Sequence, residues 1–177
     1  MTSNNARLAA LLSAILAAAA LRLVPHPPNF SPIDAMALFS GAYLGRRAIA
    51  FIAPLAALLL SDAILGFYHG MGTVYATVGL VVLIGWWLQE RRTALRTGAA
   101  AVLGSVTFFV VTNLGMWLMS GLYPLTYAGF IACYTAAIPF FQNTLAGDLF
   151  YAALLFGGFA LAQHVIPRLR AGAPQTA

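Results

Sequence analysis

The sequence has 177 residues, of which 62% are hydrophobic and only 7% are charged. A water-soluble domain carries about a quarter charged residues, so this composition excludes a soluble globular protein. The net charge of +5 comes from arginines that stand singly or in pairs between apolar runs, which argues against a nucleic-acid partner. We therefore predict one all-α membrane domain over residues 1–177, with the lipid bilayer as its surroundings.

Apolar runs predict six transmembrane helices in one bundle. The predicted segments are 8–24, 31–44, 48–67, 73–88, 98–119 and 143–166. The first could be read as a secretory signal, because Arg7 precedes an apolar run with small residues near 18–21; we favour a retained helix. The second is too short to cross a bilayer unaided, so it is predicted to be tilted or partly re-entrant.

Residues 126–142, just before the sixth predicted helix, are harder to interpret. They are apolar enough for a span but short, and they contain Pro139. A seventh crossing would also place Arg168 and Arg170 on the opposite side from the other arginines. We therefore predict an interfacial segment that lies over the outer face or dips into it.

The arginines predict the orientation of the six spans. Eight of the nine lie on one side, which the positive-inside rule makes cytoplasmic. The sequence thus predicts a multi-pass protein of the bacterial inner membrane with both termini in the cytoplasm. The eight are Arg7, Arg46, Arg47, Arg91, Arg92, Arg96, Arg168 and Arg170.

Polar residues gather toward the predicted outer face. At about 1.5 Å of rise per residue, four of them, from four different helices, share one depth in the outer third of the membrane. An ionisable group inside a membrane is costly unless paired or hydrated, so such a set predicts a substrate-binding site. The set is Arg22, Asp62, Asn113 and Asp148, with His26, Asn29, His69 and Asn143 above it and Tyr151 on the same helical stripe as Asp148.

Two other features have structural interpretations. Ser31 and Pro32 look like the start of a helix, with Asp34 in its first turn as a capping residue rather than a ligand contact. Residues Ala10, Ala14 and Ala18 form a small-residue stripe, which predicts a close approach of another helix or of a partner protein.

Several motifs resemble those of a widespread family of uncharacterised small bacterial membrane proteins. They are residues 25–39 (PHPPNFSPIDAMALF), Ser61-Asp62, 112–115 (TNLG), 136–141 and 143–151 (NTLAGDLFY). More distantly, the layout is similar to the S components of energy-coupling-factor vitamin transporters. That similarity implies an outward-facing pocket, and a contact of the alanine stripe with a transmembrane coupling subunit that works with ATPases.

One vitamin B12 transporter type of that fold has a histidine and an aspartate that His26 and Asp62 match. It also uses a cysteine, and no cysteine stands near residue 67 here. The single cysteine, Cys133, excludes an intrachain disulfide.

Three functions remain open from the sequence. The first is capture of a small molecule, with a vitamin as one option. We expect no cofactor for it, and the sequence contains no nucleotide-binding motif. The second is a membrane enzyme with an Asp and His site at the outer surface, although no second acidic residue stands beside Asp62 or Asp148 in the sequence. The third is an accessory subunit without a ligand. We expect binding or transport rather than catalysis, and the metal question stays open.

Overall fold

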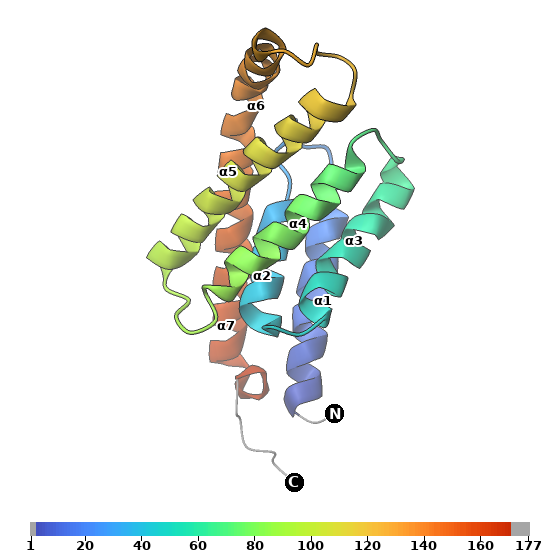
Figure 1. Cartoon of the computed structure of the whole chain (residues 1–177). Coiled ribbons are helices and arrows are strands. Elements are labelled where there is room, and N and C mark those ends of the chain that lie inside the picture. The colour runs from blue at the N-terminus through green and yellow to red at the C-terminus, as the bar shows by residue number, and fades with distance from the viewer. Residues whose placement is uncertain (1–2, 171–177) are drawn as a thin grey trace.

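The helices of the chain are seen in a computed structural model that describes residues 3–170 (Figure 1). In chain order they are α1 Ser3–Leu21, α2 Ile33–Leu44, α3 Ile49–Leu65, α4 Met71–Trp86, α5 Ala94–Met119, α6 Tyr127–Ala152 and α7 Gly158–Val165. A π-helical segment, Ala153–Gly157, joins α6 to α7, and a 3₁₀ turn, Pro167–Leu169, follows. No β-strand occurs between residues 3 and 170. The predicted all-helical class is confirmed.

Three helical stretches of the described chain are long and apolar enough to cross a membrane. They are Asn4–Leu21, Ala94–Met119 and Tyr127–Val165. The helices α2, α3 and α4 are apolar but shorter. Apolar side chains that point outward are numerous on the long helices, Leu95 and Tyr127 among them. A surface of this kind suits lipid rather than water.

Successive helices run up and down, so the connections alternate between two ends of the bundle (Figure 1). The start of α1, the end of α7 and the connections 45–48 and 87–93 lie at one end. The connections 22–32, 66–70 and 120–126 lie at the other. We call the first the arginine end, because eight of the nine arginines lie in or beside its segments.

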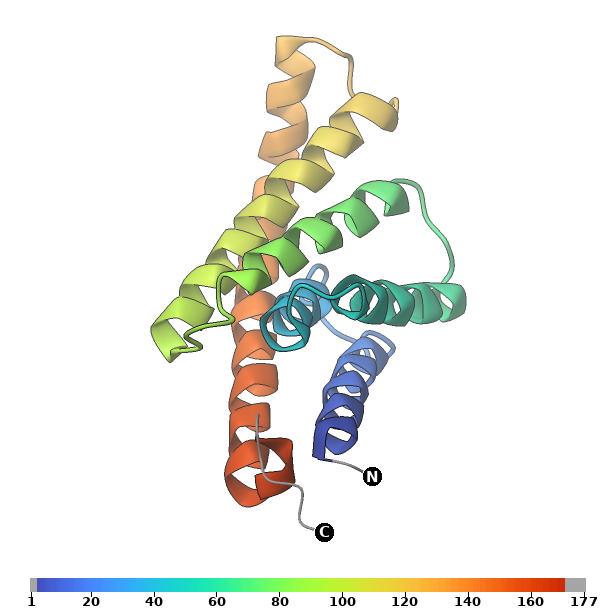
Figure 2. The same ribbon diagram turned by 60° about the horizontal axis from the view of Figure 1, so that its bottom comes forward.

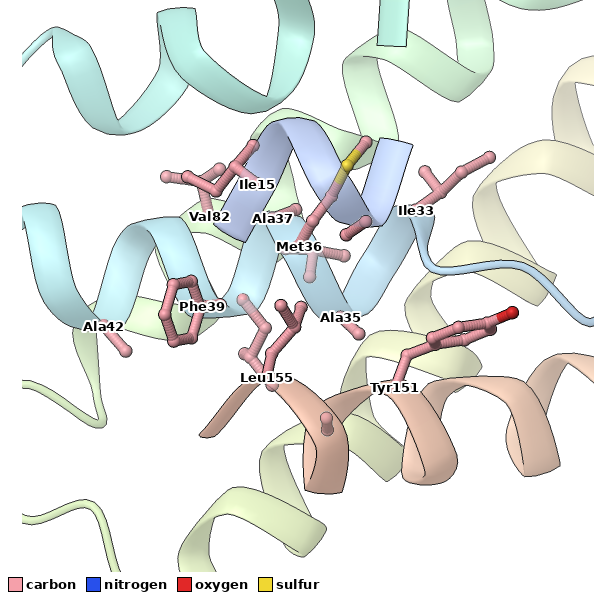
Figure 3. Packing of buried hydrophobic residues seen from close by; sticks show 14 of the residues in the cluster. Ile15, Ile33, Ala35, Met36, Ala37, Phe39, Ala42, Val82, Tyr151 and Leu155 are labelled. Carbon is pink, nitrogen blue, oxygen red and sulfur yellow. The ribbon is translucent and has the colours of Figure 1, made fainter. Parts of the chain in front are cut away.

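Helix α2 forms the centre of the bundle (Figure 2). It contacts α1, α3, α4, α5 and α6, and nearly all of its residues are buried. Figure 3 shows Met36 and Phe39 of α2 among side chains from its neighbours, such as Ile15 and Val82. Because other helices cover α2, its small length of 12 residues does not leave its ends facing lipid.

Two glycines allow α2 and α4 to touch through their backbones. A β-carbon on Gly41 would overlap the carbonyl oxygen of Val82, and one on Gly85 would overlap that of Leu38. Both glycines are helical, so they are needed for space and not for an unusual backbone conformation. This contact sets the position of α2 and therefore of the residues at its first turn.

Residues 126–142 are not separate from the sixth predicted helix, whose predicted start at residue 143 is wrong. They belong to the long helix α6, which begins at Tyr127. Thr126 is its N-cap, and the Thr126 hydroxyl accepts a hydrogen bond from the Gly129 N–H at 3.2 Å. The helix continues past Pro139 because the segment packs along α5. Tyr134 donates to the Val110 carbonyl at 2.7 Å, and the Phe109 and Phe141 rings lie 5.1 Å apart. A proline is tolerated in a membrane helix when neighbouring helices stabilise it.

The helical stretch from Tyr127 to Val165 has 39 residues. At 1.5 Å per residue it is roughly 58 Å long, against a hydrocarbon core of about 30 Å. The stretch is therefore longer than a membrane core is thick. Its first part forms a helical hairpin with α5, and the interfacial placement of residues 126–142 stays a prediction.

The alanine stripe of α1 faces the inside of the same chain. Ala18 is 3% exposed, and Ala10 and Ala14 pack partly buried against the central core. The close approach that small residues permit is thus used by neighbouring helices of this chain, since α1 contacts α2 and α3. Ala18 is therefore covered within the chain, while contact of the stripe with a coupling subunit stays a prediction.

Arginines and aromatic rings close the arginine end. The Arg92 guanidinium donates two hydrogen bonds to the Ala42 carbonyl, at 2.9 and 3.1 Å, and lies 4.5 Å from the centre of the Tyr43 ring. The Trp86 indole donates to the Gly45 carbonyl at 3.0 Å. These contacts satisfy carbonyl groups at the carboxyl end of α2, where a positive charge also opposes the helix dipole.

Candidate functional site

A cavity of about 430 Å³ lies at the end of the bundle opposite the arginine end. Its walls come from α2, α5 and α6, from the ends of α3 and α4, and from the connections 22–32 and 66–70. Polar lining residues include Arg22, His26, Asn29, Asp34, Asn113 and Asp148. Four phenylalanines supply much of the apolar wall: Phe108, Phe109, Phe140 and Phe141. A concave site with a few polar groups among aromatic side chains is typical of small-molecule binding.

Arg22 is already paired. Its Nη2 atom lies 2.8 Å from Asp62 Oδ1, and the two side chains are 9% and 1% exposed. Arg22 also donates to the Ser61 hydroxyl, while the Tyr75 hydroxyl donates to Asp62 Oδ2 at 2.9 Å. Asp62 lies behind Arg22 and does not line the cavity. The positive charge at this wall is therefore balanced within the chain.

Asp34 and Asp148 meet at the cavity wall formed by α2 and α6. They are 4% and 3% exposed, and their carboxyl groups lie within hydrogen-bonding range of each other. The Ser105 hydroxyl donates to Asp148 Oδ2 at 2.6 Å. Asp34 Oδ1 receives no hydrogen bond from any donor in the described part of the chain. We call these two residues the carboxyl pair.

Asp34 lies in the first turn of its helix as predicted, but Ser31 is not the N-cap. Helix α2 begins at Ile33, and neither Ser31 nor Asp34 makes a side-chain capping hydrogen bond. Asp34 does lie in the first turn of α2, but it points to Asp148 across the bundle. No second acidic residue stands near Asp148 in the sequence. The structure supplies one from α2, where Asp34 lies beside Asp148.

Helix α5 lines the cavity with Thr112 and Asn113. Both side chains donate to carbonyls of their own helix, Thr112 to Phe108 at 2.6 Å and Asn113 to Phe109 at 2.8 Å. Asn113 therefore does not bridge two helices through this bond. These polar groups are held in position along α5 before any ligand arrives, which reduces the ordering that binding requires.

Comparison with known proteins gives a family but no activity. Residues 2–169 match a family of unknown function, DUF6580. The chain belongs to this family. No curated protein and no solved structure matches it. The resemblance to an uncharacterised family is confirmed over most of the chain, and the function has to be argued from the cavity itself.

Two of the predicted binding residues in this member of DUF6580 hold the 22–32 connection against α6. The Asn143 side chain donates to the Pro28 carbonyl at 2.9 Å, and the Tyr151 ring packs 5.6 Å from that of Phe30. Between them, Gly147 lets the backbone of Phe30 approach closely, since a β-carbon there would be 3.1 Å from Phe30 Cα. Asn143 and Tyr151 do not line the cavity. They position the connection that covers it.

The remaining predicted residues lie at the rim. His26 is exposed and lines the cavity, whereas His69 is exposed in the 66–70 connection and does not line it. No sequence pattern singled out Tyr68, which lines the cavity from the same connection. Burial and then the Asp62 carboxylate raise the pKa of the Tyr68 hydroxyl, whereas Arg22 lowers it. The phenol is therefore a neutral hydrogen-bonding group at neutral pH.

The backbone conformation at position 29 explains why an asparagine stands there. Its φ is 62°, in the left-handed region that asparagine and glycine tolerate better than other residues. We expect Asn29→Ala to destabilise the protein by about 1 kcal/mol, and Asn29→Gly to cost less. Thermal unfolding of both variants in detergent checks this. Equal loss of stability in the two variants would show instead that the carboxamide group itself is required.

Proposed function

We propose that this protein captures a small molecule in the cavity from the outer side of a bacterial inner membrane, as the binding component of an uptake system. The observation that carries the proposal is the cavity itself. It is lined by polar groups from separate helices and by four phenylalanines. Its volume of about 430 Å³ falls within the range of small-molecule sites, roughly 300–1,000 Å³.

The arginines support the outward direction of the cavity. By the positive-inside rule the arginine end faces the cytoplasm, so both termini lie inside and the cavity opens outside. Arg22 is the exception at the cavity end, and it is neutralised by Asp62. A paired arginine is not expected to oppose this orientation.

The cavity is blocked toward the arginine end. Beyond the carboxyl pair lies a narrow void with no room for a water molecule, lined by Ala35, Val81, Ala101 and Gly104 among others. A bound molecule could pass inward only if α5 or α6 moved away from α2. This favours alternating access, with energy from a partner, over a channel. A coupling subunit with ATPases, as in the vitamin transporters that the sequence resembles, would be such a partner.

The test uses a pair of threonine variants on α5. Thr112 lines the cavity and Thr107 does not, while both hydroxyls bond to carbonyls of the same helix. Thr112→Trp is expected to fill the cavity and to lower the amount of any small molecule that co-purifies with the protein by at least about tenfold. Thr107→Trp is expected to retain it. Mass spectrometry of extracts from the purified variants measures both.

The same compound, isotopically labelled, is then offered to cells. Uptake is expected in cells with the wild-type protein or Thr107→Trp, and not in cells with Thr112→Trp. Equal occupancy in the two tryptophan variants would contradict binding in the cavity. Binding without uptake would contradict a role in transport.

One observation favours a membrane enzyme as the second candidate. The carboxyl pair brings two acidic groups together, an arrangement that serves general acid and base catalysis in other proteins. Among the described residues no group of three or more histidine, cysteine or acidic side chains is placed to hold a metal ion. If purified protein converts the co-purifying compound, and Asp148→Asn stops conversion while the compound still binds, the enzyme is the better description.

A further inference from the structure

The basic group at the cavity wall is already paired, whereas the acidic groups there are not. Among residues 3–170, Arg22 is the sole arginine that lines the cavity, and its guanidinium is occupied by Asp62 and Ser61. The carboxyl pair has no basic partner, because neither Asp34 nor Asp148 forms an ion pair within residues 3–170. Once the Arg22–Asp62 pair is set aside, the ionisable groups left deep in the cavity are carboxyl groups.

The carboxyl pair also has an unused acceptor. Ser105 supplies one hydrogen bond to Asp148, but Asp34 Oδ1 is buried without a donor. Buried polar atoms are almost always hydrogen-bonded, and an unsatisfied one at a cavity wall points to a missing partner. The missing partner must be a donor, and a positively charged donor would also balance the pair.

The aromatic part of the cavity wall comes from α5 and α6. Phe108 and Phe109 come from α5, and Phe140 and Phe141 come from α6. Aromatic faces attract both apolar groups and cations that have lost part of their water. A bare divalent metal ion fits less well, since Mg²⁺ and Ca²⁺ take about six or more oxygen ligands and the pair with Ser105 offers few.

We propose that the ligand of this cavity is a small organic ammonium ion. Its charged N–H groups donate to Asp34 and Asp148, and its hydrocarbon part lies against the phenylalanines. This inference rests on the proposed function and names the chemical class of its ligand. Arg22 makes no contact with the charge of the ligand, because it stays paired with Asp62.

Three probes with similar carbon skeletons test the charge preference. They are 2-phenylethylamine, which is an ammonium ion at neutral pH, 3-phenylpropionate and 2-phenylethanol. Binding to purified wild-type protein in detergent is measured by isothermal titration calorimetry. We expect the ammonium probe to bind at least about tenfold more tightly than the carboxylate, with the alcohol in between. This comparison requires no variant and so does not depend on whether a variant folds.

Isosteric variants test the residues. Asp34→Asn and Asp148→Asn are each expected to weaken 2-phenylethylamine binding by about tenfold and to change 2-phenylethanol binding much less. Glu90→Gln is the matched control, because it removes the carboxylate of an exposed residue in the 87–93 connection at the arginine end. It is expected to leave binding of the ammonium probe unchanged.

The outcomes separate this inference from the proposed function. If the ammonium probe binds no better than the carboxylate, or if both Asn variants bind it like wild type, the ammonium proposal is overturned. Probes that bind without charge preference and are lost in Thr112→Trp would overturn the ammonium class and still support capture in the cavity. An ammonium preference that persists in Thr112→Trp would place the binding elsewhere and overturn the inference.

Discussion

Arg22→Met is expected to lower the free energy of unfolding by about 3–5 kcal/mol, because it leaves Asp62 as a buried charge without a basic partner. Asp62 is 1% exposed, and only the Tyr75 hydroxyl would remain as a donor to its side chain. In wild-type protein the two charges compensate each other across 2.8 Å. Methionine keeps much of the length of the arginine side chain. The lost stability therefore comes more from the missing charge than from missing volume.

A double variant provides the control for this prediction. Arg22→Met combined with Asp62→Leu removes both charges, and it is expected to recover much of the stability that Arg22→Met loses. Thermal and denaturant unfolding of the three proteins in the same detergent measures the difference. If Arg22→Met is as stable as wild type, Asp62 is not held by this pair. Arg22 would then be free to contact a ligand, contrary to the neutral wall described above.

Gly41→Ala is expected to destabilise the protein by about 3 kcal/mol or more, the upper range for overpacking a tightly packed contact. The added methyl group would overlap the backbone carbonyl of Val82, which cannot move away as a flexible side chain can. Relief requires α2 and α4 to separate. Because α2 carries Asp34 and fills the centre of the bundle, the separation would also disturb the cavity.

Gly79→Ala is the matched control for this contact. Gly79 lies in α4, and a β-carbon there would meet nothing within 4 Å. Replacing a helical glycine with alanine at an open position is expected to stabilise by about 0.5–1 kcal/mol. The free energies of unfolding of Gly41→Ala and Gly79→Ala, each compared with wild type, check the expected loss and the expected gain of stability. Similar stability of the two variants would show that α2 and α4 do not meet at Gly41.

The ends of five of the six predicted helices lie within five residues of those in the structure. Their apolar runs are bounded by prolines, glycines and arginines, and these are local signals that act through backbone conformation and the cost of burying charge. Local signals also misplaced the start of the sixth helix, which extends back to Tyr127. Pro139 and the polar residues after it read as a break. The contacts of Tyr134 and Phe141 with α5 that sustain the helix join residues far apart in the chain.

The cavity shows the same division. Sequence reasoning named Arg22, Asn113 and Asp148, because polar residues inside apolar spans are conspicuous, and all three line the cavity. It could not separate Asp62, which pairs with Arg22, from residues that face the cavity. It set Asp34 aside, because a local capping pattern was the favoured explanation of that residue.

By itself, the sequence determined the membrane class, the helical content and the distribution of arginines between two ends, since these depend on composition and on near neighbours in the chain. Only the tertiary structure decided which polar groups satisfy one another. Side-chain pairing depends on distances across the bundle, and the glycine contact of α2 with α4 sets where α2 lies. For that reason Asp34 meets Asp148 and Arg22 meets Asp62, and the cavity presents carboxyl groups rather than a balanced set of charges.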